Sequence, residues 1–228
     1  MVQLGFLKVL KGSLIREQAC LLGLVYSDDP PYRILRTKEM TSRELDKLRD
    51  IARMTEIFRN TGNFRSSLSF LCTNVFHGDW FRLFSGLAGH YRVRNGFGRI
   101  FSAKENILVF LEFGIKSCSE SQAGDPVHFR DLLKYDKYRY DARSFIAELG
   151  MNMSPRHPEM PEELFHRISS GISTSKNFKS RCEKYCFDAT GSDSTQALQV
   201  RSEEARTVSF VIYNISSDRP EKIAAVRI

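Results

Sequence analysis

The stretch "TSRELDKLRDIARMTEIFRNTG", residues 41–62, indicates the fold more clearly than any other part of the chain. Thr41 and Glu44 match a capping box, in which two side chains satisfy backbone N–H groups at the start of a helix. The following apolar residues recur at helical spacing: Leu45, Leu48, Ile51, Ala52 and Phe58. The run Asn60-Thr61-Gly62 supplies a stop signal. This pattern predicts one long amphipathic helix.

Later segments add more helices and a pair of strands. Further helices are expected to begin near Phe64, Asp79, Ser102 and Asp125, and a short one covers residues 161–169. Ser102 and Glu105 repeat the capping-box pattern. The β-branched runs "TVSFVIYNI", residues 207–215, and "KIAAVRI", residues 222–228, predict a β-hairpin.

The N-terminal stretch "QLGFLKVLKGSLIRE", residues 3–17, predicts a strand that is apolar on both faces, followed by a turn at Lys11-Gly12-Ser13. Such a strand belongs inside a sheet, yet no convincing partner strand follows it for many residues. The expected fold is therefore mainly α and α+β overall. It is a bundle of about five to six helices with a strand at the N-terminus and a β-hairpin at the C-terminus.

Composition limits the class of protein. The chain has 228 residues, of which 42% are hydrophobic and 11% aromatic, enough to fill a core. No apolar run approaches the roughly 18 residues of a membrane span. The N-terminal residues lack the cationic flank and the cleavage-site pattern that are typical of a secretory signal. We therefore expect a cytoplasmic protein without a membrane partner.

One basic stretch raises the alternative of nucleic-acid binding. The net charge is +7 and the excess is spread thinly, but "HYRVRNGFGRIF", residues 90–101, places Arg92, Arg94 and Arg99 among aromatic residues. Arginines and aromatic rings can bind phosphates and stack on bases. A basic loop whose aromatic side chains pack inward explains the same pattern. We favour the packed loop, because three arginines are few for a nucleic-acid binder.

Residues that commonly carry catalysis or bind metal form no recognised motif. Phosphate-loop, nucleophile-elbow and H-E-x-x-H patterns are missing from the sequence. Cys182 and Cys186 form a Cys-x3-Cys pair without further ligands at a metal-site spacing, and we interpret them as ordinary thiols on or near a helix. Cys72 is expected to be a buried apolar side chain. The histidines fall in different predicted elements: His77, His90, His128, His157 and His166. No catalytic, cofactor-binding or metal-binding residue is predicted in this chain.

Several of these stretches resemble a known family. Residues 3–17 look like the end of a radical SAM barrel, whose sixth strand commonly closes with a leucine-rich run and Gly-Thr; Gly12-Ser13 stands at that place. Residues 30–71 are similar to domain of unknown function 4080, a C-terminal domain of cobalamin-binding radical SAM proteins. The matching features are Leu35-Arg36-Thr37-Lys38, the Leu45/Leu48 helix and Phe58-Arg59-Asn60-Thr61-Gly62. "LLKYDKYRYD", residues 132–141, and the late "FVIYN" also fit.

The resemblance implies an accessory role. Intact relatives would use a 4Fe-4S cluster, S-adenosylmethionine and, in some members, cobalamin. The cluster is held by Cys-x3-Cys-x2-Cys early in the barrel, and the pair at Cys182 and Cys186 lacks the third cysteine and comes too late. We therefore expect residues 1–29 to be a remnant of the barrel end and residues 30–228 to be a helical accessory domain, within which residues 171–206 are polar and poorly ordered. The implied partners are the missing barrel and the cobalamin-binding domain, and nucleic acid is the less favoured partner.

The same resemblance suggests what the chain is. It looks like the carboxyl-terminal part of a larger enzyme, in the form of a truncated frame, an isolated domain or one piece of a split protein. Without the cluster motif it should have no cofactor and no activity of its own. Without a barrel beside it, the apolar N-terminal strand should either fold back onto the helices or pair with another chain.

Overall fold

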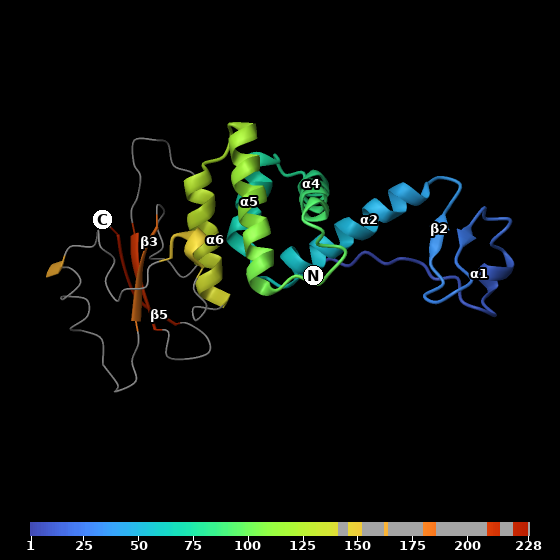
Figure 1. Cartoon of the computed structure of the whole chain (residues 1–228), viewed down its shortest axis with the longest axis horizontal. Helices are drawn as coiled ribbons and strands as arrows, with labels where there is room; N and C mark the ends of the chain where they lie inside the picture. The colour runs from blue at the N-terminus through green and yellow to red at the C-terminus, as the bar shows by residue number, and fades with distance from the viewer. Residues whose placement is uncertain (141–145, 152–161, 164–179, 186–208, 215–220, 228) are drawn as a thin grey trace. The chain divides into compact units, whose positions relative to one another are not determined.

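The computed structural model describes residues 1–140, 146–151, 162–163, 180–185, 209–214 and 221–227 (Figure 1). It divides into two compact units. Unit 1 comprises Met1–Thr61 and Phe81–Arg99, and unit 2 comprises Gly62–Trp80 and Ile100–Ile228. Helices dominate both units in the described residues, which confirms the predicted mainly α class. In these residues no helix combines the length and the apolar character needed to cross a membrane.

Unit 1 is built around the helix predicted from residues 41–62. Its elements are α1 (Leu14–Glu17), β1 (Val25–Tyr26), β2 (Ile34–Arg36), α2 (Ser42–Met54), the π-helical turn η1 (Thr55–Asn60) and α4 (Trp80–Val93), which begins at the unit boundary. The capping box is confirmed: Thr41 Oγ1 accepts from Glu44 N at 3.3 Å, and Glu44 Oε2 accepts from Thr41 N at 2.7 Å. Strands β1 and β2 pair antiparallel.

Two apolar clusters hold unit 1 together. Val9, Ile34 and Leu45 are buried against one another, with Ile15, Leu24, Tyr26 and Met40 packed around them. Farther along α2, the fully buried ring of Phe58 in η1 meets the ring of Tyr91 in α4 edge to face, with centroids 6.5 Å apart. The first cluster joins the start of α2 to β2 and the N-terminal segment, and the second joins η1 to α4.

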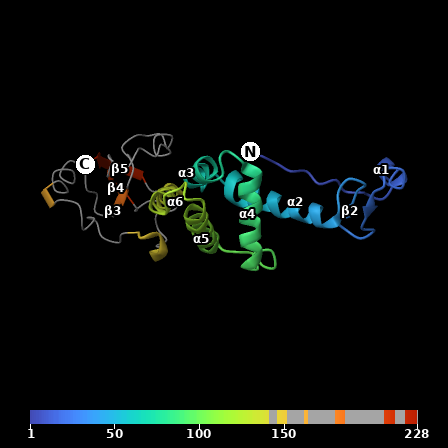
Figure 2. The same ribbon diagram turned by 90° about the horizontal axis from the view of Figure 1, so that it is seen from above.

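The N-terminal residues differ from the expected strand. Residues 3–10 form no regular strand, and their backbone makes one isolated β-bridge, between Lys8 and Arg33. The segment runs beside α2, from the end of the helix toward its beginning (Figures 1 and 2). Val9 is fully buried, whereas Leu4, Leu7 and Leu10 are about half exposed. The segment thus packs against the helical unit through Val9 and does not form the expected strand.

Unit 2 contains the remaining helices. These are α3 (Arg65–Phe70), the π-helical turn η2 (Leu71–Val75), α5 (Ala103–Ser121), α6 (Pro126–Tyr140) and the short 3-10 helix η3 (Ala147–Leu149). The capping box of Ser102 and Glu105 starts α5, as predicted. Of the helix expected at 161–169, only residues 162–163 are described, and they are helical. The sequence therefore located the helices well, but not the π-helical turns.

Aromatic rings form the core of unit 2. Phe110 of α5 meets Phe64 and Phe129 edge to face, at centroid distances of 5.3 and 5.6 Å. Gly114 lies against the ring of Phe129, so closely that an added Cβ would come within 2.1 Å of it. Cys72 is 2% exposed, which confirms the expected buried thiol. Close packing of α5 on α6 thus depends on a glycine.

A three-stranded antiparallel sheet lies near the C-terminus. Its order is β3 (Ser180–Tyr185), β4 (Ser209–Asn214) and β5 (Glu221–Arg227). The pairing of β4 with β5 confirms the predicted hairpin. Strand β3 was not predicted, and the helix expected at or near Cys182 is wrong, because this residue pairs with Ile212 of β4. Cys186 lies outside the described residues.

Candidate functional site

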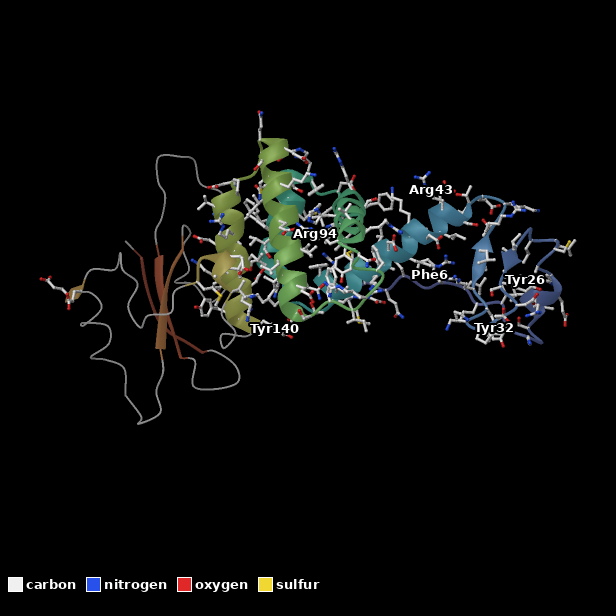
Figure 3. All side chains as sticks on the ribbon, viewed as in Figure 1. Phe6, Tyr26, Tyr32, Arg43, Arg94 and Tyr140 are labelled. Atoms are coloured by element: carbon white, nitrogen blue, oxygen red, sulfur yellow. The ribbon has the colours of Figure 1, made fainter. Side chains whose placement is uncertain are left out.

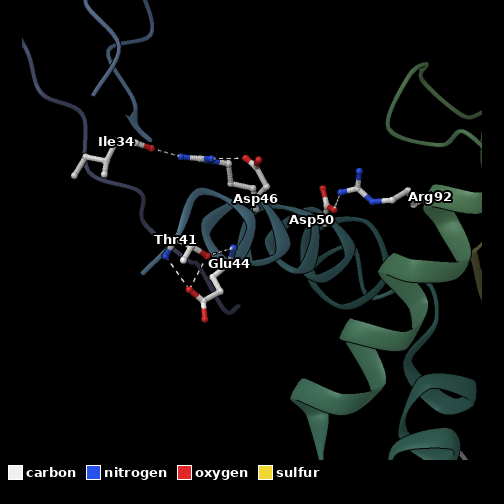
Figure 4. Close-up of polar contacts among 7 residues, drawn as sticks. Ile34, Thr41, Glu44, Asp46, Asp50 and Arg92 are labelled. Carbon is white, nitrogen blue, oxygen red and sulfur yellow. Dashed lines mark hydrogen bonds and ion pairs between the residues drawn. The ribbon is translucent and has the colours of Figure 1, made fainter. Parts of the chain in front are cut away.

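The basic loop after α4 is engaged in internal contacts. Arg92 forms an ion pair with Asp50 of α2 (Figure 4) and lies over the ring of Phe97, 5.3 Å from its centroid. Arg53 approaches the same ring at 5.7 Å, and Tyr91 meets it edge to face at 5.2 Å. Two guanidinium groups and a buried tyrosine therefore converge on one aromatic side chain of unit 1.

The aromatic residues of this stretch point inward, as the packed-loop interpretation expects. Tyr91 is 1% exposed, Phe101 is 7% exposed and Phe97 is half-buried. Arg94, labelled in Figure 3, and Arg99 also have interaction partners. A stacking platform for bases needs exposed rings, so these side chains are better suited to packing than to binding nucleic acid.

The most unusual polar site is a carboxylate buried inside unit 2. Asp136 of α6 is 3% exposed and sits at the start of α3. Its Oδ1 accepts from Ser66 N at 3.1 Å, and its Oδ2 accepts from Ser67 N at 2.8 Å and from Ser67 Oγ at 2.7 Å. The residue before α3, Phe64, offers no capping side chain. Asp136 thus satisfies the N–H groups of the first turn of α3 from a distant position in the sequence, in place of a capping side chain at Phe64.

Burial decides the protonation of this carboxyl group. Removal from water raises the pKa of Asp136 to about 6, and the hydrogen bonds from Ser67 and then Ser66 act against this rise. The Ser66 hydroxyl lies close enough to lower the pKa, but its geometry falls short of a hydrogen bond. The arrangement can stabilise a helix start and can hold a proton at mildly acidic pH.

Two lysines flank Asp136 along α6 and are buried as well. Lys134 is 5% exposed and lies 3.3 Å from a carboxylate oxygen of Asp131, and Lys137 is 4% exposed and also has a partner. Buried charges need partners of opposite charge or hydrogen bonds. The run at residues 132–141 lies in a predicted helix and fits the family resemblance, but neither pattern indicates a buried polar cluster. The sequence could have indicated this cluster, because charged residues recur every few positions among the leucines and tyrosines of this helix.

The thiols and imidazoles of the described residues form no metal-binding group. Burial, and next the charge of Asp125, raise the pKa of the Cys118 thiol to about 11, so it stays protonated and unreactive at neutral pH. His128 packs on the ring of Phe70 at 5.0 Å. Among the described residues, no three His, Cys, Asp or Glu side chains gather closely enough to hold a metal ion. His157 and His166 lie outside the described residues.

The run Leu35-Arg36-Thr37-Lys38 joins β2 to the start of α2. The Thr37 hydroxyl accepts from Glu39 N and Met40 N at 3.2 and 3.0 Å, which shapes the turn before the capping box. Lys38 reaches back and donates from Nζ to the carbonyl of Leu21 at 3.1 Å. Its aliphatic stem covers Gly23, whose φ is +62°. Thr37 therefore shapes the local turn, and Lys38 joins two segments of the chain.

The second run, Phe58 to Gly62, also joins segments. Phe58 fills the core, and the Thr61 hydroxyl donates to Ile57 O at 2.9 Å. Gly62 has a φ of +74°, a conformation that ends helices and favours glycine. Asn60 hydrogen-bonds with both backbone groups of Val2. Asn60 thus joins the end of η1 to the N-terminal residues of unit 1.

Comparison with known proteins identifies a family. The model of the family described as "Protein of unknown function (DUF4080)" matches residues 22–187. No curated protein and no solved structure gives a significant match to the chain. The matched residues include the joint at Thr37 and Lys38, the joint at Asn60, and the buried Asp136.

Proposed function

The chain belongs to the DUF4080 family, and from this premise we propose that it is the C-terminal accessory domain of a cobalamin-binding radical SAM enzyme. The proposed partner is the barrel and cobalamin-binding part of that enzyme, in the cytoplasm. There the cluster and S-adenosylmethionine supply the radical chemistry, and residues 30–228 of this chain have a structural role.

One observation carries this proposal: side chains from each family-like run hold segments of the chain together. Lys38 fastens the turn at Leu21, Asn60 holds Val2, and Asp136 caps α3. A catalytic constellation would direct polar side chains toward a common space where substrate binds. Here the polar atoms of all three residues are used within the domain, which favours a structural module.

The exposed apolar side chains near the N-terminus support the proposal that this chain binds a partner. Large apolar side chains are exposed along residues 2–25: Val2 44%, Leu4 45%, Leu7 51%, Leu10 50%, Leu14 67%, Leu21 78%, Leu22 46% and Val25 39%. Full burial of one Leu or Val side chain is worth roughly 1.5–3 kcal/mol. A partner that covers several of them gains substantial binding energy, and an apolar cover such as the helices around a barrel fits this face.

The direct test is association with a radical SAM barrel from a member of the same family. Size-exclusion chromatography with light scattering should show a one-to-one complex, and Leu4→Asp with Leu7→Asp should abolish it. Val93→Asp is the matched control, because Val93 is 84% exposed and lies at the end of α4. If the complex does not form, or if the control disrupts it equally, the proposed role is wrong.

A nucleic-acid-binding module is the alternative. It would use the stretch from Arg92 to Arg99, but Arg92 is paired with Asp50 and the nearby rings are largely covered. Titration of labelled single strands at two salt concentrations distinguishes the two roles, because phosphate contacts release counterions and make binding strongly salt-dependent. We expect no such binding.

A further inference from the structure

The N-terminal segment, residues 1–11, is fastened to unit 1 at separate points along its length. At one end, Val2 N donates to Asn60 Oδ1 at 3.0 Å, and Asn60 Nδ2 donates to Val2 O at 2.7 Å. At the other end, Val9 N donates to Tyr32 O at 2.8 Å, beside the bridge between Lys8 and Arg33. The segment is therefore held by its backbone at both ends.

Arg49 holds the middle of the segment. Its guanidinium lies 5.7 Å from the ring centroid of Phe6 (labelled in Figure 3), donates to Ile34 O at 2.5 Å and pairs with Asp46 at 2.6 Å (Figure 4). The planar guanidinium can make in-plane hydrogen bonds and still stack on a ring, which an ammonium group cannot do in the same way. Arg49 therefore links α2, β2 and the N-terminal segment.

The spacing of the contacts suits an extended peptide. Residues 2 to 6, at roughly 3.3 Å each, span about 13 Å when extended. Residues 49 to 60 of α2 and η1, at roughly 1.5 Å each, span about 16 Å. An extended chain that runs against the helix direction can thus meet Asn60 with residue 2 and Arg49 with residue 6, the direction seen in Figure 2.

The contacts made by Asn60 depend on backbone atoms alone. The carboxamide oxygen of Asn60 accepts from the N–H of Val2, and its NH2 group donates to the C=O of the same residue. A residue in an antiparallel ladder satisfies its neighbour in the same way. Asn60 therefore recognises extended backbone at position 2 whatever the side chain there.

We propose that Asn60 and Arg49 form a binding site for an extended peptide, in which Asn60 holds the backbone of residue 2 and Arg49 holds the ring of Phe6. This site holds the N-terminal segment against α2 when no strand partner is present. Residues 3–10 cannot lie in this site and in a barrel at the same time, so the site competes with the barrel. This competition rests on the proposed function, but the site itself does not. The ligand is the chain's own residues 2–9.

Backbone 15N relaxation on the full chain tests the site. Ordered backbone has order parameters of roughly 0.85 and flexible backbone falls below about 0.6. In the wild type we expect ordered values at residues 3–9. Asn60→Ala should lower them to the flexible range at residues 3–5, and Asn60→Asp, which keeps the acceptor and loses the donor, should lower them less. Arg49→Ala should act mainly at residues 5–7.

The control is Glu56→Ala, which removes an exposed side chain from the same π-helical turn and should change nothing. The resonances of residues 81–93 in α4, which belong to the same unit, report whether each variant is folded. If Asn60→Ala unfolds the domain, Asn60→Asp decides the question. Flexible residues 3–5 in the wild type, or unchanged order in folded Asn60 variants, would overturn the proposal. Neither result would bear on association with a barrel, which is measured separately.

Discussion

Asp136 caps a helix through Ser67, a residue 69 positions before it: the Asp136 carboxylate accepts from both the backbone N–H and the hydroxyl of Ser67. Helix starts leave N–H groups without partners, and a nearby side chain usually satisfies them. In α3 the partner comes from α6 of the same unit. Tertiary structure therefore supplies what the local sequence around Phe64 lacks.

Removal of this cap should destabilise the domain. Asp136→Ala leaves two N–H groups and a hydroxyl buried without their acceptor, which should cost about 2–4 kcal/mol in the free energy of unfolding. Asp136→Asn keeps one acceptor oxygen and should lose less. Urea denaturation followed by circular dichroism measures both. A loss below about 0.5 kcal/mol for the alanine variant, which is typical of a neutral surface change, would contradict the assigned role.

The same group should make stability depend on pH. The pKa of Asp136 is raised in the folded state, from an ordinary 3.8 to about 6, so the folded chain binds this proton more tightly than the unfolded chain. Protonation of Asp136 therefore adds to the free energy of unfolding. This stabilisation is fully present below about pH 4 and is lost as the pH rises toward 6. It amounts to about 3 kcal/mol at most.

Denaturation of the wild type and of Asp136→Asn across pH 4–7 isolates this effect, because the variant lacks the titrating group. The stability of the wild type relative to the variant should fall as the pH rises. A relative gain would mean that the hydrogen bonds outweigh burial and that the pKa is lowered.

Gly114 tests the packing of α5 on α6. Alanine favours a helix over glycine by about 1 kcal/mol, but the new Cβ would meet the buried ring of Phe129 at 2.1 Å. Overpacking of this kind costs about 1–3 kcal/mol, so Gly114→Ala should be destabilising. Phe129→Leu should partly rescue it in a double-mutant cycle of thermal unfolding. If Gly114→Ala stabilised the domain, α5 and α6 would have to be farther apart than the structure shows.

Gly23 tests the joint made by Lys38. Gly23→Ala places a side chain at a φ of +62° and within 2.5 Å of the Lys38 stem. We expect a loss of about 1–2 kcal/mol, from the left-handed backbone and the displaced lysine. Lys38→Ala removes the collision but not the backbone strain, so the double variant should lose less than the sum of the single variants. Strict additivity in chemical denaturation would show that the two residues do not touch.

Local signals in the sequence predicted the helices. Thr41 with Glu44, and Ser102 with Glu105, fix helix starts through contacts between residues three apart. Strand β3 depends instead on pairing with residues far along the chain, and its run Ser-Arg-Cys-Glu-Lys-Tyr shows little β-pattern by itself. The cap at Asp136 and the hold of Asn60 on Val2 are long-range contacts between polar atoms. Periodicity reports on apolar faces, and so it gave no indication of either.

Anaerobic reconstitution with iron and sulfide, followed by metal analysis of the purified chain, tests the accessory role most directly. A domain that leaves radical chemistry to a separate barrel should retain no stoichiometric iron–sulfur cluster and show no charge-transfer absorption. It should also leave S-adenosylmethionine uncleaved under reducing conditions. Four irons per chain, with cleavage of S-adenosylmethionine by this chain alone, would contradict the account.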